Sequence, residues 1–206
     1  MEYILKEFSS LEDVKSSDFY ELCSYHWEAE APYRPKTYAT VGLVNGELVA
    51  VFKCYEQSPR TECTKRDDPV YMDSCLEFFV APVGDRREYV NVECNSAGVF
   101  LTEFGDGKYN RSLVSALTEL SPLVSNFKGE DDKGSYWGVC VELTRDFVAD
   151  LYKIDCCDVS FDSIRLNFYK CGDGCETQHY IAFSPVTTLP PGFHNPDCFV
   201  TFKKEI

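Results

Sequence analysis

The stretch Asp68-Pro-Val-Tyr-Met-Asp-Ser-Cys-Leu-Glu-Phe-Phe-Val80 joins an acidic, proline-bearing loop to a segment that alternates like a β-strand. Its apolar side chains at positions 76, 78 and 80 share one face, and Glu77 lies on the other. Burying a carboxylate in so apolar a strand is costly unless a partner compensates it. We therefore expect Glu77 to hold an internal partner or to face a cleft, with Tyr71 in the adjoining loop.

The composition describes an acidic globular protein. Its 206 residues predict a single domain over 1–206, with a strand and helix extension at 1–36 packed on it. A hydrophobic content of 44% argues against disorder. The net charge of -14 repels phosphate backbones and anionic lipid, so we expect neither nucleic acid nor membrane as a partner.

The cysteines and the N-terminus favour a cytoplasmic protein. The eleven cysteines are scattered, and many lie in apolar runs, which is typical of free thiols used as small core residues. Cys171, Cys175 and His179 could be offered as zinc ligands, but their spacing matches no known finger or ribbon. The N-terminus lacks the pattern of a signal peptide, and no apolar run is long enough to span a membrane.

Alternating strands and turns predict the fold class. Asn45-Gly46 favours a type I′ turn between strands at 38–44 and 47–56. Helical spacing predicts helices at 11–27 and 145–151. Further strands are expected at 2–8, 88–95, 99–104, 135–143, 163–171, 179–183 and 198–202. Together these elements predict an all-β protein, an antiparallel β-sandwich with one or two short helices.

Three separated strands each carry polar side chains on one face. If one sheet holds all three strands, carboxylates, amides, a guanidinium and aromatic rings converge on one surface, which suits the hydroxyls and C–H faces of sugars. A solvated outer sheet face is the alternative interpretation. The side chains concerned are Glu77, Asn91, Glu93, Asn95, Arg165, Asn167 and Tyr169.

Six segments resemble the family 9 carbohydrate-binding modules, and most closely their stand-alone family 9-like relatives. They occur in the family's order and cover most of the chain from about residue 37 onward. The resemblance implies a β-sandwich of the immunoglobulin-like or jelly-roll-like kind that is related to DOMON-type domains. The segments are Glu-Gln-Ser-Pro-Arg (56–60), Asp-Asp-Pro-Val-Tyr-Met-Asp-Ser-Cys-Leu-Glu-Phe-Phe-Val (67–80), Tyr-Val-Asn-Val-Glu-Cys-Asn (89–95), Arg-Leu-Asn-Phe-Tyr-Lys-Cys-Gly-Asp (165–173), His-Tyr-Ile-Ala-Phe-Ser-Pro (179–185) and Phe-His-Asn-Pro (193–196).

The resemblance also implies a sugar clamp. Characterised modules of the family hold a sugar between two aromatic side chains, typically tryptophans, with charged and amide groups on the hydroxyls. The matching positions here are Tyr71 and Phe183 for the aromatic pair and Glu77 for the hydroxyl-binding carboxylate. Arg165 and Asn167 match the second polar block.

Relatives of this family bind two cofactors, calcium and haem, which are alternatives to a protein without a cofactor. Some family members hold structural calcium, and Asp67, Asp68 and Asp73 could supply oxygen ligands, although an ordinary acidic loop is the preferred interpretation. Haem binding, known among DOMON relatives, would draw on Met72 and His179 as axial ligands.

The sequence therefore favours non-catalytic binding of a mono- or oligosaccharide in carbohydrate catabolism, alongside glycan-processing enzymes such as glycoside hydrolases. An enzyme using Glu77 and Glu93 as a glycosidase carboxylate pair is one alternative. A protein-interaction domain without sugar binding is the other, since the fold permits it.

Overall fold

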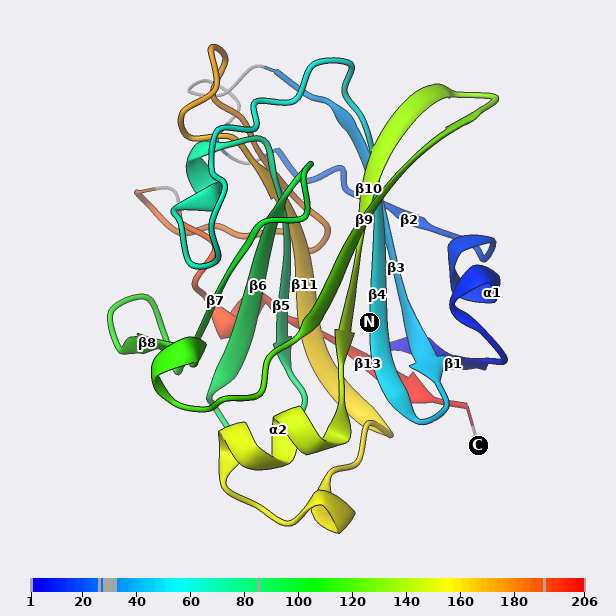
Figure 1. Ribbon diagram of the computed structural model, residues 1–206, viewed down its shortest axis with the longest axis vertical. Helices are drawn as coiled ribbons and strands as arrows, with labels where there is room; N and C mark the ends of the chain where they lie inside the picture. Colours follow the sequence, from blue (N-terminus) through cyan, green and yellow to red (C-terminus); the bar gives the residue numbers. More distant parts are fainter. Residues whose placement is uncertain (1, 26, 28–32, 85, 191, 206) are drawn as a thin grey trace.

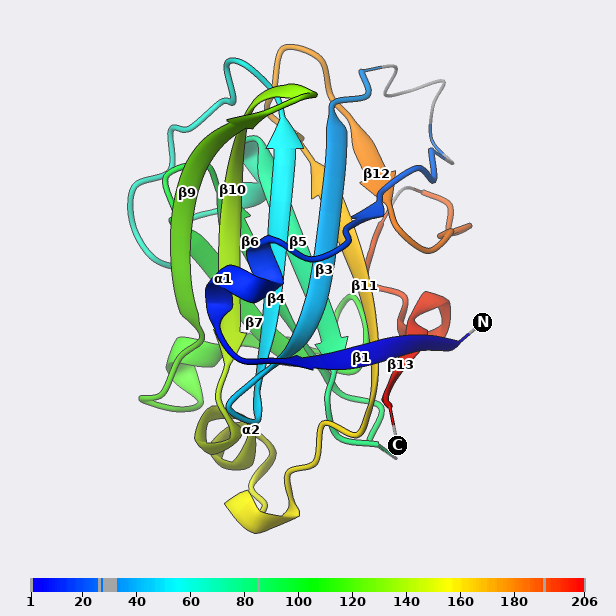
Figure 2. The ribbon, with the colours of Figure 1, turned by 90° about the vertical axis from the view of Figure 1, so that its right-hand side faces the viewer.

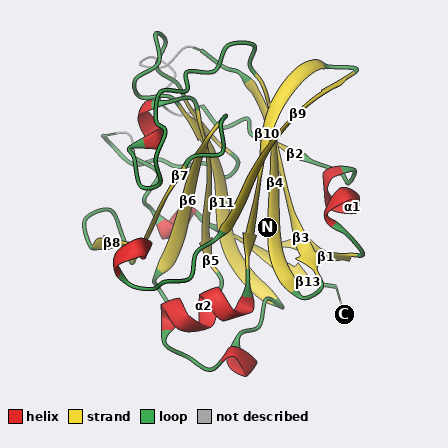
Figure 3. Ribbon diagram, in the orientation of Figure 1, coloured by secondary structure: helices red, strands yellow, loops and turns green. Residues whose placement is uncertain are grey.

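A computed structural model describes residues 2–25, 27, 33–84, 86–190 and 192–205, and its strands form two facing layers (Figures 1 and 3). The first layer follows the order β8 (Arg111–Leu113), β7 (Phe100–Gly105), β6 (Tyr89–Asn95), β5 (Cys75–Ala81), β11 (Ser163–Cys171) and β13 (Val200–Lys204), with β12 (Tyr180–Ala182) paired to β11. The second layer follows the order β3 (Lys36–Val44), β4 (Glu47–Tyr55), β10 (Gly134–Leu143) and β9 (Leu123–Asp131), with β2 (Tyr20–Glu21) paired to β3. The predicted β-sandwich is confirmed.

Strand β1 (Glu2–Phe8) joins the two layers (Figure 2). Its residues 2–5 pair in parallel with β13, and its residues 6–8 pair in parallel with β3. Because one strand serves both layers in turn, the sheet curls over at this side, while β8 and β9 remain its two end strands. The N-terminal segment is therefore part of the sheet, and its two parallel pairings are an addition to the antiparallel pattern expected from the hairpins.

The turn between β3 and β4 has the predicted backbone conformation. Asn45 has a φ of 53° and Gly46 a φ of 82°. A type I′ turn needs positive φ at both central residues, a conformation that Asn and Gly adopt at little cost. The hairpin thereby sets the register in which Val44 pairs with Glu47.

The space between the layers holds the main apolar core. Phe168 of β11 meets Phe52 of β4 across the two layers, edge to face, with ring centroids 5.4 Å apart. Within its own layer Phe168 stacks against Phe78 of β5 at 5.7 Å. All three rings are fully buried. The alternating apolar positions of β5 and β11 thus face the core, as their pattern predicts.

The helices are few. Helix α2 (Arg145–Tyr152) confirms the helix predicted at 145–151, and Thr144 caps it by accepting a hydrogen bond from the Phe147 amide. Helix α1 covers only Leu11–Lys15, so the helix predicted at 11–27 is wrong for the described residues after Lys15, and residue 26 of that prediction lies outside them. The run Ser16-Ser17-Asp18 ends it, since Ser and Asp side chains compete for backbone groups. Among the described residues, no helix is long and apolar enough to cross a membrane.

Candidate functional site

Strands β6, β5 and β11 are neighbours, so the polar faces expected to converge do share one layer. The pairing register places Glu93, Glu77 and Tyr169 in one row across the three strands. All three side chains lie on the face that points away from the main core. The convergence of these strands on one surface is therefore a property of the fold.

This outer face is covered and not solvated. A second apolar cluster lies over it, and Glu77 and Glu93 are only 3% and 4% exposed. The cover comes from segments outside the long strands, including Trp27, Val186 and Phe193. The alternative of a solvated polar face is therefore wrong, because irregular segments fold back over these strands.

A cavity of about 280 Å³ remains between the sheet face and its cover. Glu77, Glu93 and Phe79 reach it from β5 and β6, together with Cys171 from the end of β11. Its other lining residues are Trp27, Tyr71, Lys108, Asp173, Tyr180, Gly192, Phe193 and His194. Aromatic rings and carboxyl groups therefore share one concave site.

Aromatic rings form one wall of the cavity, and each is held by its neighbours. Trp27 lies 5.4 Å from the Phe193 ring and 5.8 Å from the Tyr180 ring. Its indole Nε1 donates to the Thr188 carbonyl at 3.0 Å. Phe193 stacks on Tyr169 with centroids 4.1 Å apart and planes 11° apart. The wall is thus anchored to the sheet through Tyr169.

Tyr71 also lines the cavity, from the short 3-10 turn η1 (Val70–Met72). The residue is 38% exposed. The loop after β11 fastens this turn, because the Asp173 amide donates to the Tyr71 carbonyl and the Gly174 amide to the Met72 carbonyl, both at 3.0 Å. A partly exposed aromatic ring on an anchored backbone is suited to stacking against a ligand.

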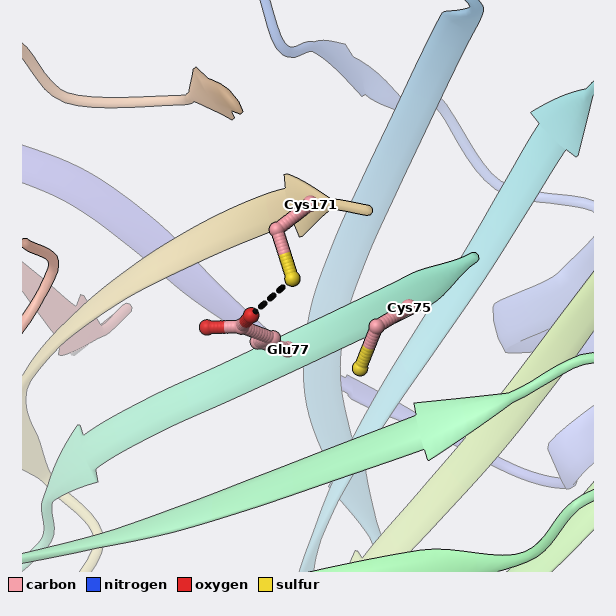
Figure 4. Close-up of side chains that lie close together, drawn as sticks. All are labelled: Cys75, Glu77 and Cys171. Carbon is pink, nitrogen blue, oxygen red and sulfur yellow. Dashed lines mark hydrogen bonds between the residues drawn. The ribbon is translucent and has the colours of Figure 1, made fainter. Parts of the chain in front are cut away.

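The two glutamates on the floor are held in distinct ways. The Cys171 thiol donates to Glu77 Oε1 at 2.8 Å (Figure 4). Asn91 Nδ2 donates to Glu93 Oε1 at 2.8 Å, while the buried Glu93 Oε2 has no partner among the described residues. Asn91 is itself fixed by Arg111, which donates to its Oδ1. One carboxyl oxygen of the floor is therefore left for a ligand.

Burial makes the floor carboxyls weak acids. Desolvation, followed by repulsion from Glu93, raises the pKa of Glu77 well above its usual value. Desolvation also raises the pKa of Glu93 to about 8, where Glu103 and Asp173 add to the effect and Asn91 and Arg111 oppose it. At neutral pH the Glu93 carboxyl therefore keeps its proton, so it can donate as well as accept a hydrogen bond.

This titration predicts a pH effect on stability. Folded Glu93 holds its proton up to a pKa of about 8, whereas an unfolded glutamate ionises near ~4.3. The folded state therefore binds more protons between these values, and stability is lost as pH rises. We expect Glu93 alone to lower the free energy of unfolding by roughly 1–2 kcal/mol between about pH 6.5 and 8, and Glu77, whose pKa burial also raises, to add to this fall. Urea unfolding across this range measures it.

The matched variant is Glu93→Gln, which should remove the part of the slope that Glu93 supplies and leave the part that Glu77 supplies. The window starts near the ordinary histidine pKa of ~6.5 because burial lowers the pKa of His179 to about 4 and that of His194 to about 3. Below pH 6.5 the two histidines make the folded state more stable as pH rises. In that range their effect opposes the loss of stability caused by Glu93. Equal slopes for wild type and Glu93→Gln would contradict the prediction.

Phe183, Asn167 and Arg165, which were predicted to bind sugar, do not line the cavity and make their contacts elsewhere. Phe183 packs in the main core, 5.2 Å from Tyr3 and 5.7 Å from Phe168, so the structure does not bring it together with Tyr71. The Asn167 side chain binds the backbone of Ser184: its Nδ2 donates to the Ser184 carbonyl, and its Oδ1 accepts from the Ser184 amide. Arg165 lies at the far end of β11.

The Arg165 guanidinium donates to the Arg86 carbonyl at 3.3 Å. Among the residues predicted to bind sugar, Tyr71, Glu77 and Glu93 line the cavity. Asn91 and Tyr169 support the lining from behind. The candidate carboxylates are thus brought together, and the candidate aromatic pair is not.

The aspartates considered for calcium accept hydrogen bonds from groups of the protein itself. Asp68 accepts from the amides of Thr64 and Lys65, at 3.0 and 2.8 Å. Asp67 accepts from the Ser115 hydroxyl at 2.7 Å. Asp73 is fully buried among backbone amides. In the described parts of the chain these three carboxylates do not form one ligand cluster.

His179 is engaged at both ring nitrogens. Nδ1 contacts the Thr177 carbonyl at 2.9 Å, and Nε2 contacts the Lys170 ammonium. Cys171 meanwhile turns towards Glu77. The zinc set with Cys175 and the haem pair with Met72 would both require one ring nitrogen of His179 to leave its present partner.

Known proteins resemble this chain in sequence and in fold. The sequence profile of carbohydrate-binding family 9 matches residues 7–204. The chain belongs to this family. Among curated proteins, none matches the sequence.

Solved structures share the fold. A candidate carbohydrate-binding protein of Bacteroides uniformis ATCC 8492 is 26% identical, with a TM-score of 0.79 and 99% of each chain covered. A family 9 carbohydrate-binding module of Caldicellulosiruptor kristjanssonii, solved with cellotriose and with glucose, is 10% identical with a TM-score of 0.56. The alignments cover 100% of this chain and 94% and 96% of the module. At that identity the likeness concerns the fold alone.

The site contains residues that the sequence analysis did not select. Asp173, Tyr180, Phe193 and His194 all lie in segments that carry the resemblance to family 9, so the segments pointed to them without assigning them a role. Trp27 is one of only two tryptophans in the chain, and it lies outside those segments. Its residue type was the one available signal.

Proposed function

We propose that this chain is a non-catalytic carbohydrate-binding protein that holds a sugar ring in the cavity between Tyr71 and the wall formed by Trp27 and Phe193. The observation that carries the proposal is the pairing of aromatic rings with the floor carboxyls of Glu77 and Glu93 in one concave site. Aromatic faces stack on the C–H faces of a sugar, while carboxyl groups exchange hydrogen bonds with its hydroxyls. Membership of carbohydrate-binding family 9 supports the same function.

The size of the cavity supports a small ligand. Its volume of about 280 Å³ lies near the lower end of the ~300–1,000 Å³ typical of ligand sites. A single sugar ring, free or at the end of an oligosaccharide, suits this space better than the middle of a long chain does. We propose a role in carbohydrate use beside glycan-processing enzymes, with residues 1–206 acting as one binding domain.

Calorimetric titration with glucose and cellotriose tests the proposal. We expect a Kd tighter than about 10 mM, which corresponds to roughly 3 kcal/mol. Tyr71→Ala and Trp27→Ala should each weaken binding by about 10-fold or more, since about 1.4 kcal/mol of stacking suffices for that. Tyr136→Ala is the matched control, because Tyr136 stands on β10 in the other layer.

Two outcomes would contradict the proposal. One is a sugar panel that shows no binding tighter than about 10 mM. The other is release of reducing sugar from oligosaccharides that disappears in Glu77→Gln, which would make Glu77 and Glu93 a catalytic pair. Equal weakening by Tyr136→Ala would mean that the lost affinity reflects stability and not stacking.

A further inference from the structure

Two cysteines face each other directly beneath the cavity. Cys75 is the first residue of β5 and Cys171 the last residue of β11, and the antiparallel register pairs them with each other. Their sulfur atoms and a Glu77 carboxylate oxygen all lie within 4.8 Å of one another (Figure 4). The thiols are therefore neighbours across the strand pair, although 96 positions separate them in the sequence.

The backbone already has the spacing that a disulfide requires. Directly opposed residues of an antiparallel pair have Cα atoms about 4.5 to 5.5 Å apart. Disulfides span Cα distances of roughly 4.4 to 6.8 Å. A disulfide between Cys75 and Cys171 therefore requires rotation of the two side chains and no movement of the strands.

Cys171 also belongs to the candidate sugar site. It lines the cavity, and its thiol donates to Glu77 Oε1 at 2.8 Å. A sulfur atom in a disulfide carries no hydrogen and cannot make this bond. The redox state of the pair thus decides whether the buried Glu77 oxygen has a donor.

We propose that Cys75 and Cys171 form a redox-sensitive modification site, and that a disulfide between them weakens ligand binding by removing the hydrogen-bond donor of Glu77. The second half of this proposal rests on the proposed sugar-binding function. The oxidant is a low-molecular-weight disulfide such as oxidised glutathione. One protein thiolate attacks a glutathione sulfur and releases one reduced glutathione. The second thiolate then attacks the mixed disulfide, which forms the protein S–S bond and releases another.

Burial decides when this exchange takes place. Cys75 is 0% and Cys171 2% exposed in the folded chain. Burial raises the pKa of Cys75 to about 12, against a hydrogen bond with Cys171, and it also raises the pKa of Cys171. Because the thiolate is the reactive form, the folded dithiol is slow to exchange. The disulfide forms while the chain folds, before the cover closes over β5 and β11.

Oxidative refolding tests the first half of the proposal. The full chain is unfolded in denaturant with a reductant and refolded in mixed reduced and oxidised glutathione. Free thiols are then alkylated, and the peptides are mapped by mass spectrometry. We expect a linked Cys75–Cys171 peptide as the main cross-link and a higher Tm than in the reduced protein. A map without this peptide, or one dominated by the exposed Cys23, Cys156 or Cys157, would overturn the proposal.

Titration with glucose tests the second half. The oxidised protein should bind roughly 3- to 10-fold more weakly than the reduced protein, because Glu77 without the Cys171 donor is no longer held in position to bind a sugar hydroxyl. Cys75→Ser is the control, because it cannot cross-link and it keeps the Cys171 donor. Its affinity should be the same after both refolding conditions. Equal affinities for oxidised and reduced wild type would overturn the coupling. If the reduced protein binds no sugar, the proposed function fails, while the peptide map still decides the cross-link.

Discussion

Replacing Lys170 with methionine is expected to lower the free energy of unfolding by about 3–5 kcal/mol. The Lys170 side chain is fully buried, and its ammonium donates to Ser74 Oγ at 2.8 Å and to the Cys171 carbonyl at 2.9 Å. It also lies 3.7 Å from the Glu56 carboxylate. Methionine fills a similar volume but leaves Glu56, only 8% exposed, without its cation. An uncompensated buried charge costs far more than the lost packing.

The double variant Lys170→Met with Glu56→Gln separates charge from packing. Because both partners are then neutral, we expect it to recover most of the lost stability. Denaturant unfolding at neutral pH measures all three proteins. A loss of less than about 1 kcal/mol in the single variant is the size expected for a solvent-exposed pair. It would contradict the interpretation of Lys170 and Glu56 as a buried ion pair.

Lys170 also shows what alternation can and cannot predict. The pattern of β11 assigns position 170 to the same face as Leu166 and Phe168, and that face is the core. Alternation predicts the face on which the side chain lies, but it does not predict which groups compensate the buried charge of a lysine there. The answer is a long-range contact, since Ser74 precedes β5 and Glu56 follows β4. Such partners have no signature in the local sequence.

The strands that carry the floor of the site were predicted well for a physical reason. On β5 and β6, one face meets the main core and the other holds Glu77 and Glu93, so a period of two is visible in the sequence. Period alone does not make these strands neighbours. The prediction that their polar faces converge depended on one sheet holding them, and the pairing of β5 with both β6 and β11 confirms it.

The walls of the site were predicted less well because they come from irregular segments. Trp27 and Phe193 lie in no strand or helix, so no periodicity assigns their direction. Phe183 directly follows β12, which has three residues, too few for a reliable alternation. The strand β9 was missed for a related reason. It lies at an edge with no fully buried residue, so it shows no apolar face in the sequence.

Replacing Asp73 with asparagine is expected to cost about 2–4 kcal/mol of unfolding free energy. Its carboxylate accepts from the amides of Glu62 and Cys63 and from Asn95 Nδ2, at distances between 2.9 and 3.0 Å. It also faces Arg60 at 3.6 Å. Asparagine keeps one acceptor oxygen but turns an NH₂ group towards these N–H donors. Because Asp73 is fully buried, water cannot replace the hydrogen bonds that the variant loses.

The pH profile and a chelator separate this role from that of a calcium ligand. Burial opposes ionisation, but the amides of Glu62 and Cys63 and the Asn95 side chain hold the pKa of Asp73 below its usual range. A lowered folded pKa means that the stabilisation is complete above the unfolded value of ~3.9 and is lost as pH falls through the folded value. Asp73→Asn should therefore lose this acid dependence. We expect EDTA to leave the Tm of the wild type unchanged, because these oxygens already have donors. A drop in Tm with EDTA that calcium reverses in the wild type, but not in Asp73→Asn, would instead make Asp73 a metal ligand.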